Sequence, residues 1–159
     1  MSTTRTHPGE STHIPTAREV MHGPVVAVAA RDTLWQAMDC MLTAHLRHVA
    51  VVEEGRAVGL LSDRDLASVW ALDPLGLKHR TPRDVLGSER PFVAPEVDVI
   101  GASERLLEFG IDALLVVDAT DRAVGVLTDH DLLGVLVNLY RDRDADRNQG
   151  VRHSKMVPD

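Results

Sequence analysis

The chain has 159 residues, of which 44% are hydrophobic and 26% charged, and this composition suits one soluble domain of moderate size or two very small ones. The formal net charge of −7 repels phosphate backbones and anionic lipids, so general binding to nucleic acid or to a membrane surface is not expected. The single cysteine, Cys40, excludes an intrachain disulfide.

The two ends of the chain differ from its middle. Residues 1–15 are polar and lack an apolar period, so we expect a flexible N-terminal tail there. Residues 141–159 begin with alternating charges, which predicts a charged C-terminal tail whose first turn or two extends the preceding helix. No apolar run approaches the roughly 18 residues of a membrane span, and the start lacks the apolar stretch of a secretory signal. These features predict a cytoplasmic protein, and the scarcity of Lys beside Arg, Ala and Val suggests a GC-rich bacterial source.

The middle of the chain is an internal repeat. Three blocks match in the same order: TAREVM (16–21) with TPRDVL (81–86), DCMLTAHLRHVAVVE (39–53) with ERLLEFGIDALLVVD (104–118), and RAVGLLSDRDL (56–66) with RAVGVLTDHDL (122–132). The offset is 65 residues in the first two blocks (16 to 81) and 66 in the third (56 to 122). We therefore expect a first repeat at 16–72, a connector at 73–80 and a second repeat at 81–140.

Each repeat predicts the same elements in chain order. A short strand, at 25–29 or 91–94, precedes an amphipathic helix, because apolar residues recur there at helical spacing. A β-rich apolar run follows, and then a turn and another strand. A last helix begins at Ser62 or Thr128. Each copy thus reads β-α-β-β-α, an α+β fold, and two copies sharing one core would bury more surface than either alone.

The repeated GLLSDRDL and GVLTDHDL place a hydroxyl at a strand-to-helix junction and an aspartate three residues later. One reading is a capping box only, in which Ser62 with Asp65 and Thr128 with Asp131 satisfy the free amides of a helix start. The other reading is a nucleotide site. Free amides and a hydroxyl bind phosphate, and an aspartate accepts hydrogen bonds from ribose hydroxyls.

Gly59 and Gly125 favour the second reading, because a glycine inside a strand often marks a close approach of backbone or ligand. No nucleophile elbow, Walker loop or complete set of metal ligands accompanies the motif. The residues by themselves leave both readings open.

The chain resembles a tandem pair of CBS domains, also called a Bateman module, of the stand-alone bacterial type. The resemblance lies in TAREVM, RHVAVVEEGRAVGLLSDRDL and ALLVVDATDRAVGVLTDHDL, and it covers about residues 16–140. It implies that the two repeats pack through their sheets about a pseudo-twofold axis and leave two clefts. It also implies an adenosine-containing ligand such as AMP, ADP, ATP or S-adenosylmethionine.

The resemblance assigns roles by motif position. Asp65 and Asp131 would hold ribose hydroxyls, and Ser62 and Thr128 would lie at the phosphate. Thr16 and Thr81 would border the base, together with the short strands at Val25–Val28 and Phe92–Ala94 and in particular Val28 and Phe92.

Two differences between the copies bear on the clefts. Arg47-His48 of the first copy is replaced by Asp112-Ala113 in the second, and an acidic residue facing the cleft would disfavour a polyphosphate. We therefore expect the first copy's cleft to be the better site. Between hydroxyl and aspartate, Arg64 is always charged whereas His130 titrates near neutrality, so phosphate binding beside His130 is expected to improve below about pH 6.5.

The sequence predicts an adenine-nucleotide-binding regulatory module, not an enzyme, that acts on an unidentified effector protein. A homodimer is expected, because DLLGVLVNLY is apolar nearly all round and needs cover on more than one face. No metal or catalytic cofactor is expected. A ligand-free dimeric scaffold and an unrecognised small enzyme are the alternatives.

Overall fold

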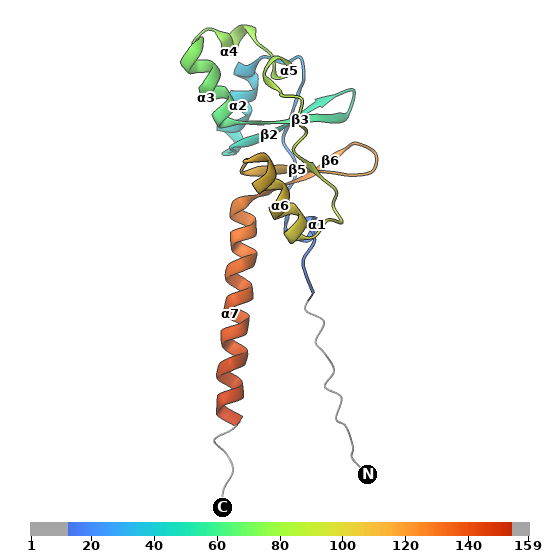
Figure 1. Ribbon diagram of the computed structural model, residues 1–159. Helices are drawn as coiled ribbons and strands as arrows, with labels where there is room; N and C mark the ends of the chain where they lie inside the picture. The colour runs from blue at the N-terminus through green and yellow to red at the C-terminus, as the bar shows by residue number, and fades with distance from the viewer. Residues whose placement is uncertain (1–12, 154–159) are drawn as a thin grey trace, which may run out of the picture.

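The protein contains two three-stranded sheets, one for each sequence repeat (Figure 1). The computed structural model describes residues 13–153, with side chains through residue 145. In each sheet the first strand runs parallel to the second, which runs antiparallel to the third. The strands are β1 (Ala27–Ala29), β2 (His48–Glu53), β3 (Arg56–Ser62), β4 (Phe92–Val93), β5 (Ala113–Val117) and β6 (Ala123–Thr128). The predicted α+β fold of two repeats is confirmed.

Four longer helices follow the predicted positions, and three short helices were not predicted. The helices are α1 (Ala17–Val20), α2 (Leu34–Ala44), α3 (Asp63–Leu72), α4 (Gly76–His79), α5 (Pro82–Val85), α6 (Val99–Phe109) and α7 (Asp129–His153). The helices α2 and α6 each start at a side-chain cap, and each ends at a residue with left-handed backbone, His45 (φ 54°) or Gly110 (φ 61°). Helix α4 lies in the expected connector, where Leu77 is buried in the first core.

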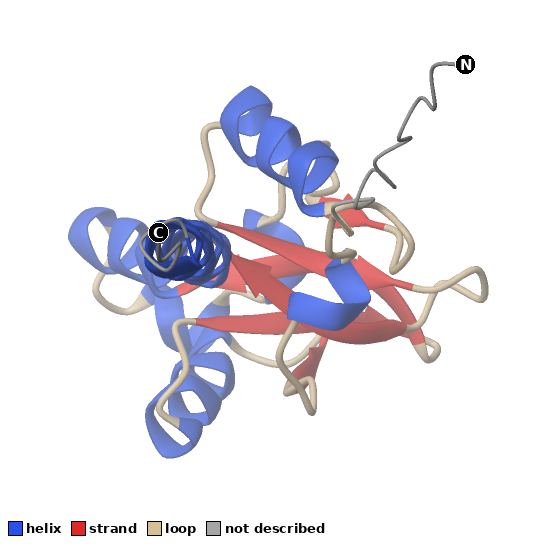
Figure 2. Ribbon diagram, turned by 90° about the horizontal axis from the view of Figure 1, so that it is seen from below, coloured by secondary structure: helices blue, strands red, loops and turns tan. Residues whose placement is uncertain are grey.

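The two sheets face each other in the middle of the molecule, with the helices outside them (Figure 2). Each repeat has its own apolar cluster beneath its helices. A third cluster joins the strands of the two sheets, and its buried members are Ala50, Ala57, Ala113, Leu115 and Val126. Each small sheet thereby buries one of its faces against the other sheet, which a single repeat could not do. For this reason the two copies form one stable unit.

The leading segment of each repeat packs against the other repeat. Ala17 is fully buried in the second cluster, and the backbones of His22 and Val126 exchange two hydrogen bonds of 3.0 Å. In the mirrored arrangement, Val85 and Leu86 pack against the first cluster. The expected boundaries at 16 and 81 therefore describe the sequence repeats, while the structural halves exchange their first elements.

This exchange accounts for the two glycines inside the strands. A Cβ atom on Gly59 would lie 2.5 Å from both terminal carbons of Leu86. A Cβ atom on Gly125 would overlap the sulfur, Cγ and Cβ of Met21. The close approach expected at these glycines is thus made by a side chain that follows the exchanged helix.

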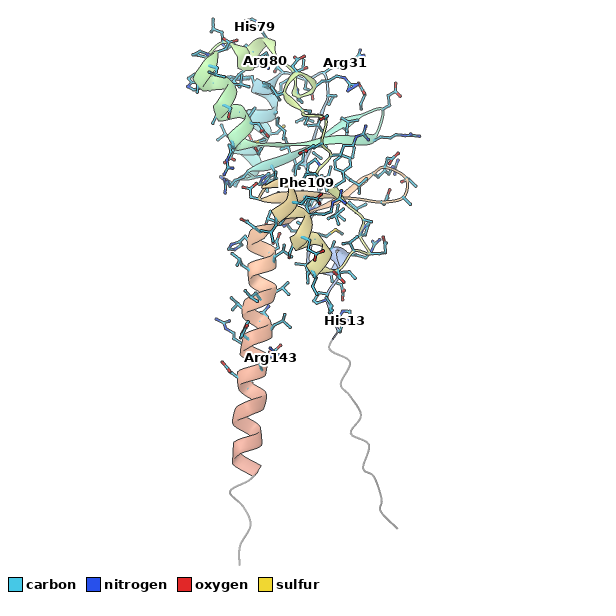
Figure 3. All side chains as sticks on the ribbon, viewed as in Figure 1. His13, Arg31, His79, Arg80, Phe109 and Arg143 are labelled. Atoms are coloured by element: carbon cyan, nitrogen blue, oxygen red, sulfur yellow. The ribbon has the colours of Figure 1, made fainter. Side chains whose placement is uncertain are left out.

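Helix α7 is much longer than the sequence indicated, since it continues to His153 instead of ending a turn or two beyond residue 140. Figure 3 shows Arg143 on the part of α7 that projects from the sheets. No helix within residues 13–153 combines the length and apolar content that a membrane span requires. The expected N-terminal tail lies almost entirely outside the described residues.

Candidate functional site

Two cavities lie where the repeats meet, one beside each copy of the repeated motif. We name them by the hydroxyl residue that lines them. The Thr128 cavity has a volume of about 380 Å³ and is lined by His22, Pro24, Val25, Val26, His45, Leu46, Arg47, His48, Asp112, Val126, Thr128, Asp129 and His130. The Ser62 cavity has a volume of about 140 Å³ and is lined by His48, Leu60, Ser62, Arg64, Asp65, Pro91, Gly110, Ile111, Asp112 and Ala113.

The strand-to-helix junctions at the two cavities have nearly identical geometry. The Ser62 amide and hydroxyl donate to Asp65 Oδ2 at 2.8 and 2.7 Å, and the Asp65 amide donates to Ser62 Oγ at 3.2 Å. The Thr128 amide and hydroxyl both donate to Asp131 Oδ2 at 2.7 Å. Both motifs therefore form complete capping boxes.

Fewer backbone amides are free at each strand-to-helix junction than the sequence implied. The amides of Asp63 and Asp129, first in their helices, donate to the carbonyls of Arg47 and Asp112 at 2.9 Å. Within the described residues, only the amide of the next residue, Arg64 or His130, has no partner at the helix start. Each capping aspartate also keeps Oδ1 outside its box. One amide and one carboxylate oxygen per junction thus remain for a ligand.

An ionic group at the centre forms a wall common to both cavities. His48 Nε2 lies 3.1 Å from Asp112 Oδ1, and these two residues line both cavities. Arg47 Nε donates to Asp63 Oδ2 at 3.0 Å, and its Nη2 lies 3.9 Å from Asp112. Partial burial raises the pKa of Asp112, but the hydrogen bond and charge of His48 and the charge of Arg47 outweigh it, so this pKa is lowered.

The structure brings six of the predicted site residues to the junctions. Ser62, Arg64 and Asp65 line one cavity, and Thr128 and His130 line the other. Asp131 stands behind the second group, where its Oδ2 lies 3.2 Å from Nδ1 of the lining residue His22.

Of the residues implied to border the base, Val25 and Val26 line the Thr128 cavity, whereas Thr16, Thr81, Val28 and Phe92 line neither cavity. Val28 is buried in the first core because the middle position of β1 points inward, which corrects its assignment. Phe92 packs between the sheets. Thr16 and Thr81 donate their hydroxyls to Glu19 and Asp84 in the capping boxes of α1 and α5. Because these short helices cross to the opposite repeat, the residues that follow them reach the cavities instead.

Sequence reasoning missed His22, Pro24 and the imidazole of His45. The signal for the first two was the repeat itself, because residues 22–26 and their counterparts at 87–91 connect the exchanged helix to the first strand. Nothing in the pattern marks His45, which occupies a helix-ending position where the second copy has Gly110. Among the described residues, no group of three or more His, Cys, Asp or Glu side chains is arranged to hold a metal ion.

Comparison with known proteins identifies the family. The family model of the CBS domain matches residues 17–71 and 83–138, which together make up more than half of the chain. The protein belongs to the CBS domain family, and its two halves are a CBS domain pair.

Solved structures share this arrangement. The CBS domain pair of protein MJ0100, in complex with 5′-methylthioadenosine and S-adenosyl-L-methionine, superimposes with a TM-score of 0.70 at 18% identity, covering 79% of this chain and 98% of that one. The conserved CBS domain protein TA0289 from Thermoplasma acidophilum has a TM-score of 0.68 at 27% identity, covering 76% of this chain and 68% of that one.

The curated relatives are larger proteins. Homoserine O-acetyltransferase from Methanococcoides burtonii is 30% identical over 122 residues, which cover 76% of this chain and 24% of that protein. Inosine-5′-monophosphate dehydrogenase from Methanocaldococcus jannaschii is 26% identical over 118 residues, covering 74% and 23%. The chain thus spans about a quarter of the length of these relatives.

Proposed function

We propose that this CBS domain pair is a non-catalytic regulatory module that binds an adenosine nucleotide in the Thr128 cavity. The position of that cavity at the repeated motif, together with its volume, carries the proposal. At about 380 Å³ it falls within the range of about 300–1,000 Å³ typical of small-molecule sites, whereas the Ser62 cavity, at about 140 Å³, falls below it. The preference expected from the sequence for the first copy's cleft is therefore reversed in our proposal.

The Thr128 cavity and the residue directly behind its wall offer groups for each part of a nucleoside phosphate. Val25, Val26 and Val126 supply apolar surface for the base. Asp131 stands behind the lining, and its Oδ1, which is outside the capping box, would accept from ribose hydroxyls. The unpaired amide of the lining residue His130 would donate to phosphate. The MJ0100 pair, which holds two adenosine compounds, supports an adenosine ligand. AMP, ADP, ATP and S-adenosylmethionine are the candidates.

Titration calorimetry with these four compounds tests the proposal. We expect at least one to bind, and Asp131→Asn to weaken it by roughly tenfold to a hundredfold, because a hydrogen bond to a charged group contributes about 1.5–3 kcal/mol. The matched variant Asp65→Asn alters the same kind of cap in the smaller cavity and is expected to leave this binding event in place. If none of the four compounds binds, the nucleotide proposal fails and a ligand-free scaffold is favoured.

A homodimer is the second part of the proposal, and exposed apolar side chains on the helices favour it. Leu107 on α6 is 82% exposed and Leu42 on α2 is 66% exposed, as are Trp70 on α3 and Leu133 and Leu136 on α7 to lesser degrees. Such faces commonly mark protein contacts. The ligand would act by changing how these faces meet a second copy or an effector protein in the cytoplasm.

Light scattering after size exclusion tests the dimer. We expect the unmodified protein to run at twice its 17.4 kDa mass, and Leu107→Glu combined with Leu136→Glu to shift it to the monomer. The matched variant Leu72→Glu also adds charge to an exposed leucine, but it sits at the end of α3 and is expected to keep the dimer. A monomeric unmodified protein at micromolar concentration would contradict this part.

A further inference from the structure

Four of the chain's eight histidines line the Thr128 cavity, and they come from three separate segments. His22 precedes β1, His45 ends α2 and His48 begins β2, and His130 is in the first turn of α7. The counterparts of these four in the other copy of the repeat are not histidines: they are Gly87, Gly110, Ala113 and Arg64. The imidazoles are therefore not a feature of the CBS repeat, and only one of them, His48, also lines the Ser62 cavity.

The charged groups that face these histidines are few. Asp131 lies 3.2 Å from His22 and Asp112 lies 3.1 Å from His48. Arg47 and Asp129 complete the charged lining, and Asp63 holds Arg47 from behind. His45 and His130 are exposed and have no side-chain partner within the described residues.

Protonation of the four imidazoles therefore changes the sign of the formal charge on the residues that line the cavity. Arg47, Asp112 and Asp129 give the lining a formal charge of −1 while the four imidazoles are neutral, and +3 when all are protonated. Including Asp63 and Asp131 behind the wall lowers both values by two and leaves the change at four charges. The Ser62 cavity contains Arg64, Asp65, Asp112 and the shared His48, so its formal charge changes only from −1 to zero.

We propose that the Thr128 cavity binds the phosphates of an adenosine di- or triphosphate with uptake of protons onto these histidines. The proposal rests on the nucleotide function proposed above and specifies its ligand class and its control. Protonation of these imidazoles makes the cavity less negative, so the site attracts phosphate more strongly as the pH falls. Adenosine compounds without phosphate, or with a positive charge such as S-adenosylmethionine, gain nothing from protonation of the site.

Calorimetry of ADP binding to the full chain at pH 7.5 and 6.5 tests the proposal. These values keep the terminal phosphate largely doubly charged, because its second pKa is about 6. Repeating each titration in two buffers of different ionisation enthalpy counts the protons taken up, and EDTA excludes divalent metals. We expect ADP to bind about threefold to tenfold more tightly at pH 6.5, since a shift of one unit in one histidine corresponds to tenfold. S-adenosylmethionine is expected to bind no more tightly at pH 6.5.

Variants assign the effect to the cavity. His22→Gln, His45→Asn and His130→Gln combined are expected to remove most of the pH response and of the proton uptake and to leave only what His48 contributes; asparagine suits the left-handed backbone of residue 45. His79→Gln is the matched control, because His79 lies on α4 at the outer end of the first repeat (Figure 3) and lines neither cavity. Circular dichroism verifies that each variant is folded.

The outcomes separate this inference from the function beneath it. If ADP binds with the same affinity at both pH values and without proton uptake, proton linkage is wrong and nucleotide binding stands. If neither ADP nor ATP binds at either pH, this proposal is overturned, and the nucleotide function is overturned with it only if AMP and S-adenosylmethionine also fail to bind. If the combined histidine variant keeps the full pH response, the protons are taken up elsewhere and the assignment to this cavity is wrong.

Discussion

The Thr128 and Ser62 cavities are built from the same motif in the same fold, yet they differ in size and charge. Their capping boxes agree to within about a tenth of an ångström in each matched hydrogen bond. Their volumes differ, at about 380 Å³ for the Thr128 cavity and about 140 Å³ for the Ser62 cavity. Four histidines line the Thr128 cavity, whereas only the shared His48 lines the Ser62 cavity. A repeated motif thus sets the backbone geometry, while flanking residues outside it decide what each cavity can hold.

The largest expected difference between the halves concerns the two strand glycines. In Gly125→Ala the new methyl group would meet Met21 as far back as its Cβ, which cannot move without the backbone. In Gly59→Ala it would meet mainly the terminal carbons of Leu86, which can rotate away. We expect Gly125→Ala to lower the free energy of unfolding by about 1–3 kcal/mol, as overpacking does, and Gly59→Ala to cost less. Urea unfolding measures both.

A double variant verifies the cause of that difference. Met21→Ala removes the side chain that meets Gly125, so adding Gly125→Ala to it is expected to cost much less than in the unmodified protein. If the two substitutions are instead additive, the exchanged segment does not press on Gly125 and the proposed asymmetry has another origin.

The capping hydroxyls provide the comparison in which the halves are expected to behave alike. Ser62→Ala and Thr128→Ala each remove the acceptor for the amide of the capping aspartate, and loss of such a cap costs about 0.5–2 kcal/mol. We expect two similar losses in the free energy of unfolding. A difference of more than about 1 kcal/mol between them would show that the two junctions are not energetically equivalent, despite their matching geometry.

The sequence predicts the parts of the fold that depend on local pattern. Alternating and helical apolar periods locate all six strands and the four longer helices, and the repeat aligns them into two halves. It does not reveal that α1 and α5 exchange partners, because a buried residue such as Ala17 has the same local pattern whichever core it enters. It also misses the length of α7, since residues beyond Tyr140 have no apolar face to give a helical period.

For the site, the motif predicts the junction residues and their mutual hydrogen bonds. It overestimates the number of free amides, because the carbonyls of Arg47 and Asp112 cap each helix start from a distant part of the chain. It assigns Val28 to the ligand although the strand turns that side chain into the core. Which cleft is larger depends on packing between the repeats, and no local pattern records that packing.

Asp112, which together with His48 lines both cavities, predicts a smaller effect, on how the stability of the fold depends on pH. The lowered pKa of Asp112 means that its charged form stabilises the folded protein above the ordinary value near 3.9, and that this contribution disappears as the pH falls below about 4. Asp112 is one-third exposed, so solvent screening limits the contribution to less than about 1 kcal/mol. We expect Asp112→Asn to be slightly less stable than the unmodified protein at pH 7, and this difference to shrink as the pH falls below about 4. A constant difference in melting temperature across this range would contradict the assignment.

The exchanged helices α1 and α5 give the smallest effect and the finest comparison. Hydrogen bonds from the Thr16 backbone, His13 and the Thr16 hydroxyl lower the pKa of Glu19 from 4.5 to about 2. The backbone and hydroxyl of Thr81 lower the pKa of Asp84 in the same way but without a histidine. Each carboxylate therefore stabilises the fold above its ordinary pKa, and the contribution of Glu19 is lost as the pH falls from about 4.5 to about 2.

We expect Glu19→Gln to flatten the acid side of a plot of melting temperature against pH more than Asp84→Asn does. Salt at about 0.5 M is expected to narrow that gap, because it screens the exposed contact with His13, which lies 2.8 Å from Glu19. Equal curves for the two variants at low salt would mean that His13 adds nothing, and that the two exchanged helices are held equally by their caps alone.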